Sequence, residues 1–314
     1  METLKLNIMK KQHLIIIAAA AILATGCNRL DIPGMVINRS DTEERVADWL
    51  DYNAQNEMPV IENAPDEYCI YSTSDAHCSD RDDYELQGDK DRLYKYVTTE
   101  RNDPNALFSL LVGDIANQSG EAGYRRADSS LRYNAVTQAE NDPCFTVLGN
   151  HDLYYDCAKY YKQYFHTSTY TIVVKTVGGF QDLYILLDSG NGTFGQRQTE
   201  WLKEQLEHRG DYRHCFVISH NWLFRTSYNY TTTPAANLPQ DEQYAFMDLM
   251  STHAVDMVIM GHFHYRDAKT FGGVRSVMTD NLNDGKVTPS YLVVRCASDV
   301  SYEYRELNLE YASD

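Results

Sequence analysis

The sequence is short of basic residues, and this shortage narrows the functions that the protein can serve. Lys and Arg number 28 against 45 Asp and Glu, which gives a formal net charge of −17 at pH 7. A surface this acidic should on average repel nucleic acid and anionic lipid headgroups. We therefore expect no nucleic-acid scaffold role. An anionic substrate would need a local positive centre, and a bound metal could supply one.

The apolar run near the N-terminus is too short to span a bilayer. Leu14 to Ala24 is an unbroken run of 11 apolar residues, a length typical of a signal-peptide hydrophobic region. Lys10 and Lys11 precede it, and small residues followed by Cys27 end it. This ending resembles a bacterial lipobox, which predicts cleavage before Cys27 and lipidation of its side chain. A plain secretory signal or a buried apolar helix is the alternative.

These features predict an extracytoplasmic, membrane-anchored bacterial lipoprotein, with residues 1–27 as its signal peptide and lipobox. The segment Asn28 to Pro33 lacks an acidic run that might direct surface display, which favours the periplasmic side. Residues 28–66 are polar and mixed, so we expect a tether plus one helix around Thr42–Asn53. The predicted catalytic domain covers residues 67–314, and the sequence does not specify an oligomeric state.

The sequence has no CxxC pair, the spacing that thiolate zinc sites commonly use, so we do not expect such a site. The six cysteines beyond the predicted signal allow 15 pairings, and the sequence does not choose among them. Three of them lie in apolar runs, where we expect small buried hydrophobic side chains. The six are Cys69, Cys78, Cys144, Cys157, Cys215 and Cys296.

Internal repeats and low-complexity segments are also absent, and from Tyr68 onward short apolar runs alternate with amphipathic stretches. This alternation predicts an α/β fold with crossover helices. The end of the chain suggests an additional antiparallel sheet from three strands at 274–278, 291–295 and 302–307. The other predicted strands are 69–71, 107–112, 145–148, 215–218 and 257–260, and the predicted helices are 91–100, 122–140, 155–165, 198–206 and 241–252.

Potential metal ligands follow five of the predicted strands, namely 69–71, 107–112, 145–148, 215–218 and 257–260. In open α/β sheets, ligands bind beyond the carboxyl ends of the strands, so these side chains should lie together. Strand ends also favour Asp and Asn as polar turn residues, but four histidines at such ends are harder to explain in that way. The residues are Asp75, His77, Asp114, Asn150, His220, His262 and His264.

The ligand types indicate a class of ion. Carboxylate, amide oxygen and imidazole without thiolate suit Fe, Mn or Zn better than Ca. The two oxygens of Asp114 could bridge two such ions. Two metals about 3.5–4 Å apart clamp phosphoryl oxygens and generate hydroxide near neutral pH. We therefore expect two divalent or transition metal ions as cofactors.

In order and residue type, the motifs resemble the calcineurin-like metallophosphoesterase family. They are Asp75-Ala76-His77, Gly113-Asp114, Gly149-Asn150-His151-Asp152, His220 and Gly261-His262-Phe263-His264. The resemblance implies a four-layer α/β/β/α sandwich of two mixed β-sheets flanked by helices.

The resemblance also implies a role for each of these residues. Asp75, His77 and His264 would hold one metal, and Asn150, His220 and His262 the other. Asp114 would bridge both. His151 would stand beside the metals and protonate the leaving oxygen or stabilise transition-state charge, with Asp152 orienting it.

We therefore predict a hydrolase acting on phosphoester bonds. A hydroxide bridging the two metals would attack a phosphate mono- or diester of a phosphorylated small molecule. The pattern also resembles the cyclic-nucleotide phosphodiesterase branch, but predicted export argues against an intracellular messenger. A non-catalytic lipoprotein that binds phosphate or metal is the second alternative.

Two segments near the motifs have further predicted roles. The loop from Trp222 to Gln240 leaves from the predicted ligand His220, so it is a candidate for substrate selection. Five tyrosines follow the Gly-Asn-His-Asp segment with a spacing typical of a helix face packed on the core. They are Tyr154, Tyr155, Tyr160, Tyr161 and Tyr164.

Overall fold

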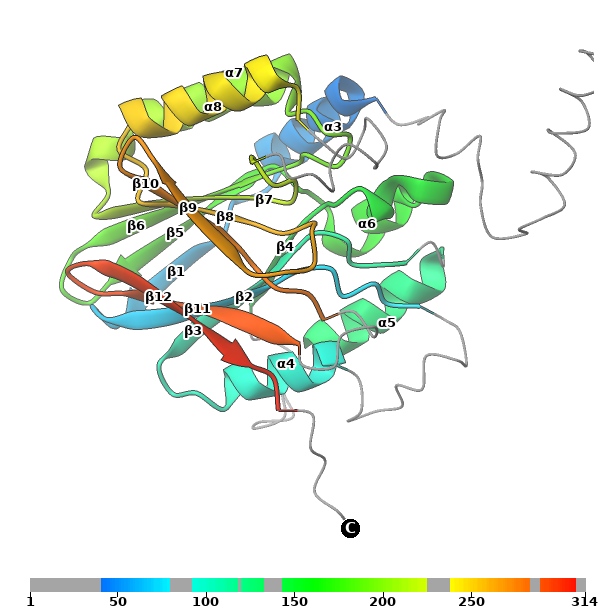
Figure 1. The fold of residues 1–314 in the computed structure, drawn as a ribbon, viewed down its shortest axis with the longest axis horizontal. Helices are drawn as coiled ribbons and strands as arrows, with labels where there is room; N and C mark the ends of the chain where they lie inside the picture. Colours follow the sequence, from blue (N-terminus) through cyan, green and yellow to red (C-terminus); the bar gives the residue numbers. More distant parts are fainter. Residues whose placement is uncertain are drawn as a thin grey trace, which may run out of the picture. The chain divides into compact units, whose positions relative to one another are not determined.

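The computed structural model describes residues 41–79, 92–117, 120–132, 143–224, 238–282 and 289–308. The predicted signal peptide, Cys27 and most of the predicted selectivity loop (225–237) lie outside these ranges. The described elements form two β-sheets with helices on their outer faces (Figure 1). Within them, no helix combines the length and apolar character that crossing a membrane requires.

One sheet of the described residues has five strands in the order β12-β11-β2-β3-β4. β2, β3 and β4 pair in parallel, while β11 pairs antiparallel with both β2 and β12. Parallel neighbours need crossover connections, which α4 (Arg92–Arg101) and α5 (Glu121–Arg132) provide here. The strands are β2 (Tyr68–Thr73), β3 (Ala106–Val112), β4 (Cys144–Val147), β11 (Ser290–Cys296) and β12 (Val300–Glu306).

The other sheet has seven strands in the order β1-β5-β6-β7-β8-β10-β9. β6, β7, β8 and β10 run parallel to one another, with α7 (Gly195–Glu207) and α8 (Gln240–Thr252) as crossovers. α6 (Ala158–Phe165) precedes β5. The strands are β1 (Val60–Ala64), β5 (Tyr170–Thr176), β6 (Gln181–Leu187), β7 (His214–Ser219), β8 (Met257–Met260), β9 (Asp267–Phe271) and β10 (Val274–Met278).

The main core lies between the two sheets, because alternate side chains of each strand point inward. Ile70 and Phe108 of the five-stranded sheet belong to the same buried cluster as Phe216 and Ile259 of the seven-stranded sheet. Two further clusters lie under the helices on the outer faces. The predicted four-layer sandwich of two mixed sheets is confirmed.

The last three predicted strands exist, but they do not form a sheet of their own. β10 joins the seven-stranded sheet, parallel to β8 and antiparallel to β9. β11 and β12 extend the five-stranded sheet beside β2. The alternating pattern identifies a strand and its buried face, but strand partners depend on contacts between distant parts of the chain.

Among the described residues no two cysteines are joined by a disulfide, and the cysteines of the predicted strands are packed largely as expected. Cys215 and Cys296 are buried, and Cys69 is half-buried. Burial raises the pKa of the Cys296 thiol to about 12, so this side chain behaves as a hydrophobic residue.

The N-terminal boundary of the folded unit differs from the predicted one. α3 (Thr42–Gln55) forms where a helix was expected, and the Asp41 carboxylate caps it by accepting from the Glu43 N–H at 2.7 Å. However, Val46 and Trp49 are buried in the core, and β1 pairs with β5. Residues from Thr42 onward therefore pack with the domain, whereas the predicted tether and N-terminal helix covered residues 28–66 and the predicted domain began at residue 67.

A buried ion pair fixes α3 to the rest of the domain. The Arg45 guanidinium donates to both oxygens of Asp188, at 2.8 Å from Nε and 3.0 Å from Nη2. Trp49 Nε1 donates to the same carboxylate at 3.1 Å. Asp188 directly follows β6, so the contact joins the N-terminal helix to the seven-stranded sheet.

Replacing Arg45 by Ala should lower the free energy of unfolding by about 3–5 kcal/mol, because it leaves a buried carboxylate without its partner. The matched control is Arg197→Ala. Arg197 lies 3.7 Å from Glu43 in an exposed pair, so its loss should change stability by no more than about 0.5 kcal/mol. Urea unfolding of both variants tests this difference, and equal losses would contradict it.

Candidate metal centre

The carboxyl ends of parallel strands from both sheets meet at one place, and all seven predicted ligands lie there. Asp75 and His77 follow β2, Asp114 follows β3, and Asn150 follows β4. From the seven-stranded sheet, His220 follows β7, while His262 and His264 follow β8. Ligand atoms of six of these residues fall into groups of three within 4.8 Å, and Asn150 Oδ1 lies 3.2 Å from His220 Nε2.

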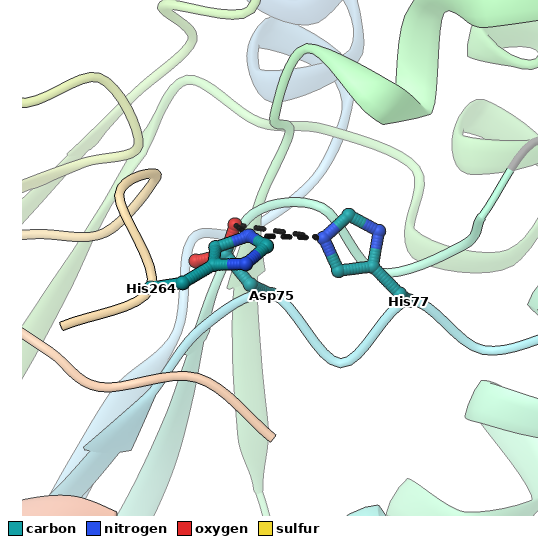
Figure 2. A group of neighbouring side chains, drawn as sticks. All are labelled: Asp75, His77 and His264. Atoms are coloured by element: carbon teal, nitrogen blue, oxygen red, sulfur yellow. Dashed lines mark hydrogen bonds and ion pairs between the residues drawn. The ribbon is translucent and has the colours of Figure 1, made fainter. Parts of the chain in front are cut away.

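The first group contains Asp75, His77 and His264 (Figure 2). The Nε2 atoms of His77 and His264 are 3.3 Å apart, and His264 Nε2 lies 3.0 Å from Asp75 Oδ1. Asp114 Oδ2 is 3.9 Å from His77 Nε2. Two imidazole nitrogens and two carboxylates therefore face one small volume, as a cation site requires.

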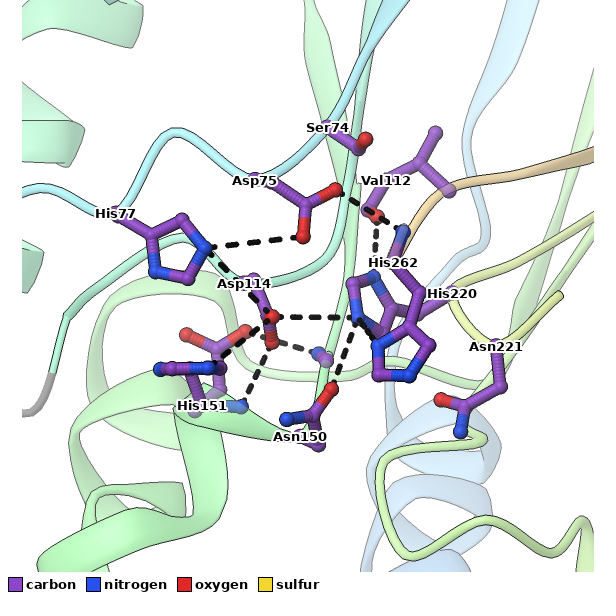
Figure 3. Close-up of polar contacts among 12 residues, drawn as sticks. Ser74, Asp75, His77, Val112, Asp114, Asn150, His151, His220, Asn221 and His262 are labelled. Carbon is purple, nitrogen blue, oxygen red and sulfur yellow. Dashed lines mark hydrogen bonds and ion pairs between the residues drawn. The ribbon is translucent and has the colours of Figure 1, made fainter. Parts of the chain in front are cut away.

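The second group contains Asp114, Asn150, His220 and His262 (Figure 3). His220 Nε2 lies 3.4 Å from Asp114 Oδ2. It also lies 3.2 Å from both Asn150 Oδ1 and His262 Nδ1. The same Asp114 oxygen faces His77 of the first group, so Asp114 lies between the two groups.

The orientation of the His220 ring leaves one defined atom for an ion. His220 Nδ1 lies 2.8 Å from the Val112 carbonyl, which can only accept, so Nδ1 carries a hydrogen and donates it. Nε2 then points toward Asp114 and Asn150. Histidine ligands in metal sites are usually fixed in this way through their other nitrogen.

The backbone of the site is strained at most of the predicted ligands. Five of the seven predicted ligands adopt left-handed φ values, namely Asp75 (52°), His77 (48°), Asp114 (51°), His262 (85°) and His264 (60°). Such conformations cost on the order of 1–3 kcal/mol each and persist where the surroundings enforce them. Their concentration here indicates that the fold accepts backbone strain in order to place these side chains.

Two glycines of the motifs allow the strand ends to approach closely. A Cβ on Gly149 would overlap the Asp114 backbone nitrogen and carboxylate oxygen, and a Cβ on Gly113 would overlap the His220 ring. Gly113 also has a φ of 81°. The residue before Asp114 and the residue before Asn150 must therefore lack a side chain.

Asp152 supports the loops of the site and does not orient His151, which corrects the predicted role. Its carboxylate accepts from the N–H groups of Ile115 and Ala116 at 3.1 Å and Gly149 at 2.9 Å, and from Tyr124 Oη at 2.8 Å. These bonds use its acceptor positions on the backbone around Asp114 and Asn150. Within the described part of the chain, the buried Nδ1 of His151 has no hydrogen-bond partner.

His151 lies beside the two groups. Its backbone N–H donates to Asp114 Oδ1 at 2.7 Å, and its Nε2 is 4.0 Å from Asp114 Oδ2. The ring stands edge to face against His77, with centroids 4.5 Å apart. About a quarter of the side chain is exposed (27%), so His151 can reach a molecule that enters the site.

The electrostatics favour a cation at the centre. Burial would raise the pKa of Asp75, but His264 and the hydrogen bonds from His264 and His77 hold it well below its ordinary value. Burial would lower the pKa of His220, but Asp114 and Asp75 outweigh it and raise the pKa to about 10. The field that retains this proton also attracts a metal ion, which must displace the proton when it binds.

Burial favours the neutral form of two other histidines of the site, His262 and His151. Burial, reinforced by His220, lowers the pKa of His262 to about 3. Burial also lowers the pKa of His151 to about 4, despite the opposing charge of Asp114. A neutral imidazole keeps the lone pair that a metal requires, so His262 Nδ1 suits the role of ligand.

Tyr154 is a site residue that the sequence analysis missed. The tyrosines after the Gly-Asn-His-Asp segment were expected on one helix face, and Tyr161 of α6 is buried in the core in that way. Tyr154 instead lies in a short 3-10 helix, η2 (His151–Asp156), and its hydroxyl accepts from Asn150 Nδ2 at 3.3 Å. The sequence does place Tyr154 four residues after Asn150, and this spacing could have indicated a contact between the two side chains.

A Gly149→Ala variant should lose most of its bound metal, because the new methyl group would displace the Asp114 loop. Overpacking of this kind also costs about 1–3 kcal/mol of stability. The control is Gly210→Ala, where a Cβ meets nothing within 4 Å. Metal content by mass spectrometry, with thermal unfolding beside it, tests this. Equal metal retention in both variants would refute the expectation.

Comparison with family models and solved structures gives an independent result. Residues 70–266 match the model of the calcineurin-like phosphoesterases. A dimetal phosphatase from Danio rerio is similar at 13% identity and a TM-score of 0.57, with coverage of 77% of this chain and 99% of that one. The comparison with curated proteins found no match.

Two other solved structures share the fold. GAP50, described as the anchor in the inner membrane complex of Plasmodium, matches at 12% identity and a TM-score of 0.57, covering 78% of this chain and 87% of that one. A putative 5'-nucleotidase from Staphylococcus aureus matches at 18% identity and a TM-score of 0.50, covering 79% and 55%. These identities establish the fold alone, whereas the family model spans more than half of the chain. The chain belongs to the calcineurin-like phosphoesterase family.

Proposed function

We propose that the protein is a metal-dependent hydrolase of phosphate mono- or diesters. The observation that carries this proposal is the arrangement of seven side chains in two ligand groups that share Asp114. Membership of the calcineurin-like phosphoesterase family supports the reaction class.

The protein groups fit two ions of the Fe, Mn or Zn type. Asp75, His77 and His264 would hold one ion, Asn150, His220 and His262 the other, and Asp114 both. The donors are imidazole nitrogens, carboxylates and one amide oxygen, and the ion pairs of both buried carboxylates are with imidazoles. When bound, two such ions clamp phosphoryl oxygens and supply the hydroxide that attacks phosphorus.

We assign His151 the task of assisting the reaction from the side of the site. Its ring is partly exposed, and contacts with His77 and Tyr154 hold it in one place. From there its neutral ring can donate a hydrogen bond to a phosphoryl oxygen, and its protonated form could give a proton to the leaving oxygen. Asp152 acts more remotely, since it fixes the loops that present Asp114 and Asn150.

Solved structures that share the fold bear on the substrate class. The solved structures with this fold include a dimetal phosphatase and a putative 5'-nucleotidase, which favours phosphorylated small molecules and nucleotides among them. With an exported protein, the phosphorylated substrate would also lie outside the cytoplasm. A cyclic-nucleotide-type phosphodiesterase is the narrower version of this proposal.

A non-catalytic role is the second candidate, and the similarity to GAP50, an anchor protein by description, favours it. In that case the site would bind phosphate or metal without turnover. The complete ligand set and the strained backbone around it favour the enzyme.

Hydrolysis of p-nitrophenyl phosphate and bis-p-nitrophenyl phosphate tests the proposal. The protein lacking residues 1–27 should be inactive after metal removal and regain activity with Mn, Zn or Fe(II). Asp114→Asn should abolish this activity, because it removes the shared charged ligand. His151→Ala should lower turnover by about 10²–10⁴ while metal content stays intact.

The outcomes separate the two candidate functions. Preference for one ester distinguishes a phosphatase from a phosphodiesterase. Tightly bound ions without turnover on a broad panel of phosphoesters would support the binding protein instead. Loss of metal in the His151→Ala variant would contradict the role assigned to His151.

We also propose that the protein is exported and anchored to a membrane through a lipid on Cys27. The support is the apolar run Leu14–Ala24 and the small residues before Cys27. The full chain expressed in a bacterium should incorporate an alkyne-labelled fatty acid, and Cys27→Ser should not. Cys69→Ser is the matched control and should keep the label. Equal labelling of wild type and Cys27→Ser would reject the anchor.

A further inference from the structure

The orientation of the Asn150 side chain decides whether it can bind a metal. A carboxamide has an oxygen that can coordinate a cation and an NH₂ group that cannot, and the two ends have nearly the same size. Packing alone therefore distinguishes them poorly. Asn150 is buried, with 6% of its surface exposed, so water cannot select the orientation either.

Two polar contacts distinguish the ends of this carboxamide. Asn150 Nδ2 donates to the Tyr154 hydroxyl at 3.3 Å, and Oδ1 lies 3.2 Å from His220 Nε2. In this orientation the hydroxyl accepts the Nδ2 hydrogen, and Oδ1 lies on the side of Asp114, His220 and His262. A hydroxyl can also donate to an amide oxygen, so Tyr154 holds the outer end of the carboxamide in place while the ligand side favours the oxygen. With the amide reversed, its hydrogens would point toward the atoms that would hold the ion.

The backbone after Asn150 places Tyr154 for this contact. η2 is kinked inside, because Tyr154 has an extended ψ of 146° and Tyr155 a left-handed φ of 54°. Asp156 follows with a left-handed φ of 61°. Two consecutive left-handed residues are uncommon, and they bring the chain out of the helix with the Tyr154 side chain still beside Asn150.

The same side chain also supports the candidate catalytic histidine. The rings of Tyr154 and His151 meet at an interplanar angle of 62°, with centroids 4.8 Å apart. On its other side, His151 contacts His77. Tyr154 therefore contacts one predicted metal ligand through its hydroxyl and the neighbouring His151 through its ring.

We propose that Tyr154 is a positioning residue of the second metal site. Its hydroxyl fixes the Asn150 carboxamide with the oxygen toward the ion shared by Asp114, His220 and His262, and its ring holds His151 beside that ion. The inference rests on the proposed function, since it assumes that the site binds two ions. It extends that function by assigning a task to a residue outside the ligand set.

The test is a metal titration that does not depend on activity. Metal-stripped protein is titrated with Zn²⁺ in competition with a chromophoric chelator. The wild type should bind two ions. In Tyr154→Phe, one ion should bind as in the wild type and the other about 10- to 100-fold more weakly, the usual effect of removing a group that orients a ligand. Thermal unfolding of the stripped variant shows that it is folded.

The matched control is Tyr164→Phe in α6. Its hydroxyl donates to the exposed Glu121 carboxylate at 3.1 Å, so the variant loses one hydroxyl hydrogen bond away from the metal site. Both ions should bind to it as to the wild type. If Tyr154→Phe also binds both ions as the wild type does, the proposal is overturned.

A second background tests the mechanism. In Asn150→Asp the ligand has oxygen at both ends, so its orientation no longer matters. Tyr154→Phe should then weaken binding of the second ion by a smaller factor than it does beside Asn150. An equal factor in both backgrounds would mean that the hydroxyl does not act through amide orientation, which also overturns the proposal. A wild type that binds fewer than two ions would reject the dinuclear centre itself, which is a distinguishable failure.

Discussion

The constraint on which this structure depends is the burial of two carboxylates, Asp75 and Asp114, at the seam between the sheets. Buried charges are costly unless opposite charge or hydrogen bonds compensate them. Their ion pairs are with imidazoles of the same site. A bound cation would complete the compensation of the two carboxylates. The left-handed backbone, the glycines beside the ligands and the support from Asp152 all serve to hold these oxygens in place.

The two-sheet architecture explains why the site can hold two ions. Each ligand group takes residues from both sheets, since Asp75 and His77 meet His264, and Asn150 meets His220 and His262. Bound ions would therefore join the carboxyl ends of the two sheets as well as serve chemistry. Whatever binds the folded site and not the unfolded chain also stabilises the fold.

The seven candidate ligands could be identified from the sequence because each belongs to a short motif at the end of an apolar strand, and the structure brings them together. The sequence predicted the partners of the last three strands and the limit of the domain poorly. The pairing of β11 with β2 and the contact of Trp49 with Asp188 join residues more than a hundred positions apart, and local patterns do not record such contacts. The role of Asp152 was misjudged for a related reason: adjacency to His151 suggested a contact, whereas the turn directs the carboxylate toward backbone N–H groups. Tyr154 was missed because its spacing fits a helix, whereas the left-handed Tyr155 and Asp156 break that helix.

The ion pair between Arg45 and Asp188 has a consequence for how the N-terminus can be processed. Asp188 precedes Ser189, whose hydroxyl accepts from the Asn221 N–H at 3.0 Å, one residue from the ligand His220. Asp188, Ser189 and Asn221 thus connect Arg45 of α3 to the candidate ligand His220. If the chain is anchored through Cys27 as we propose, a protease that cuts before Asp41 would release the domain and leave this series of contacts whole. A cut after Arg45 would remove the partner of the buried Asp188 carboxylate and disturb the contacts that lead to His220.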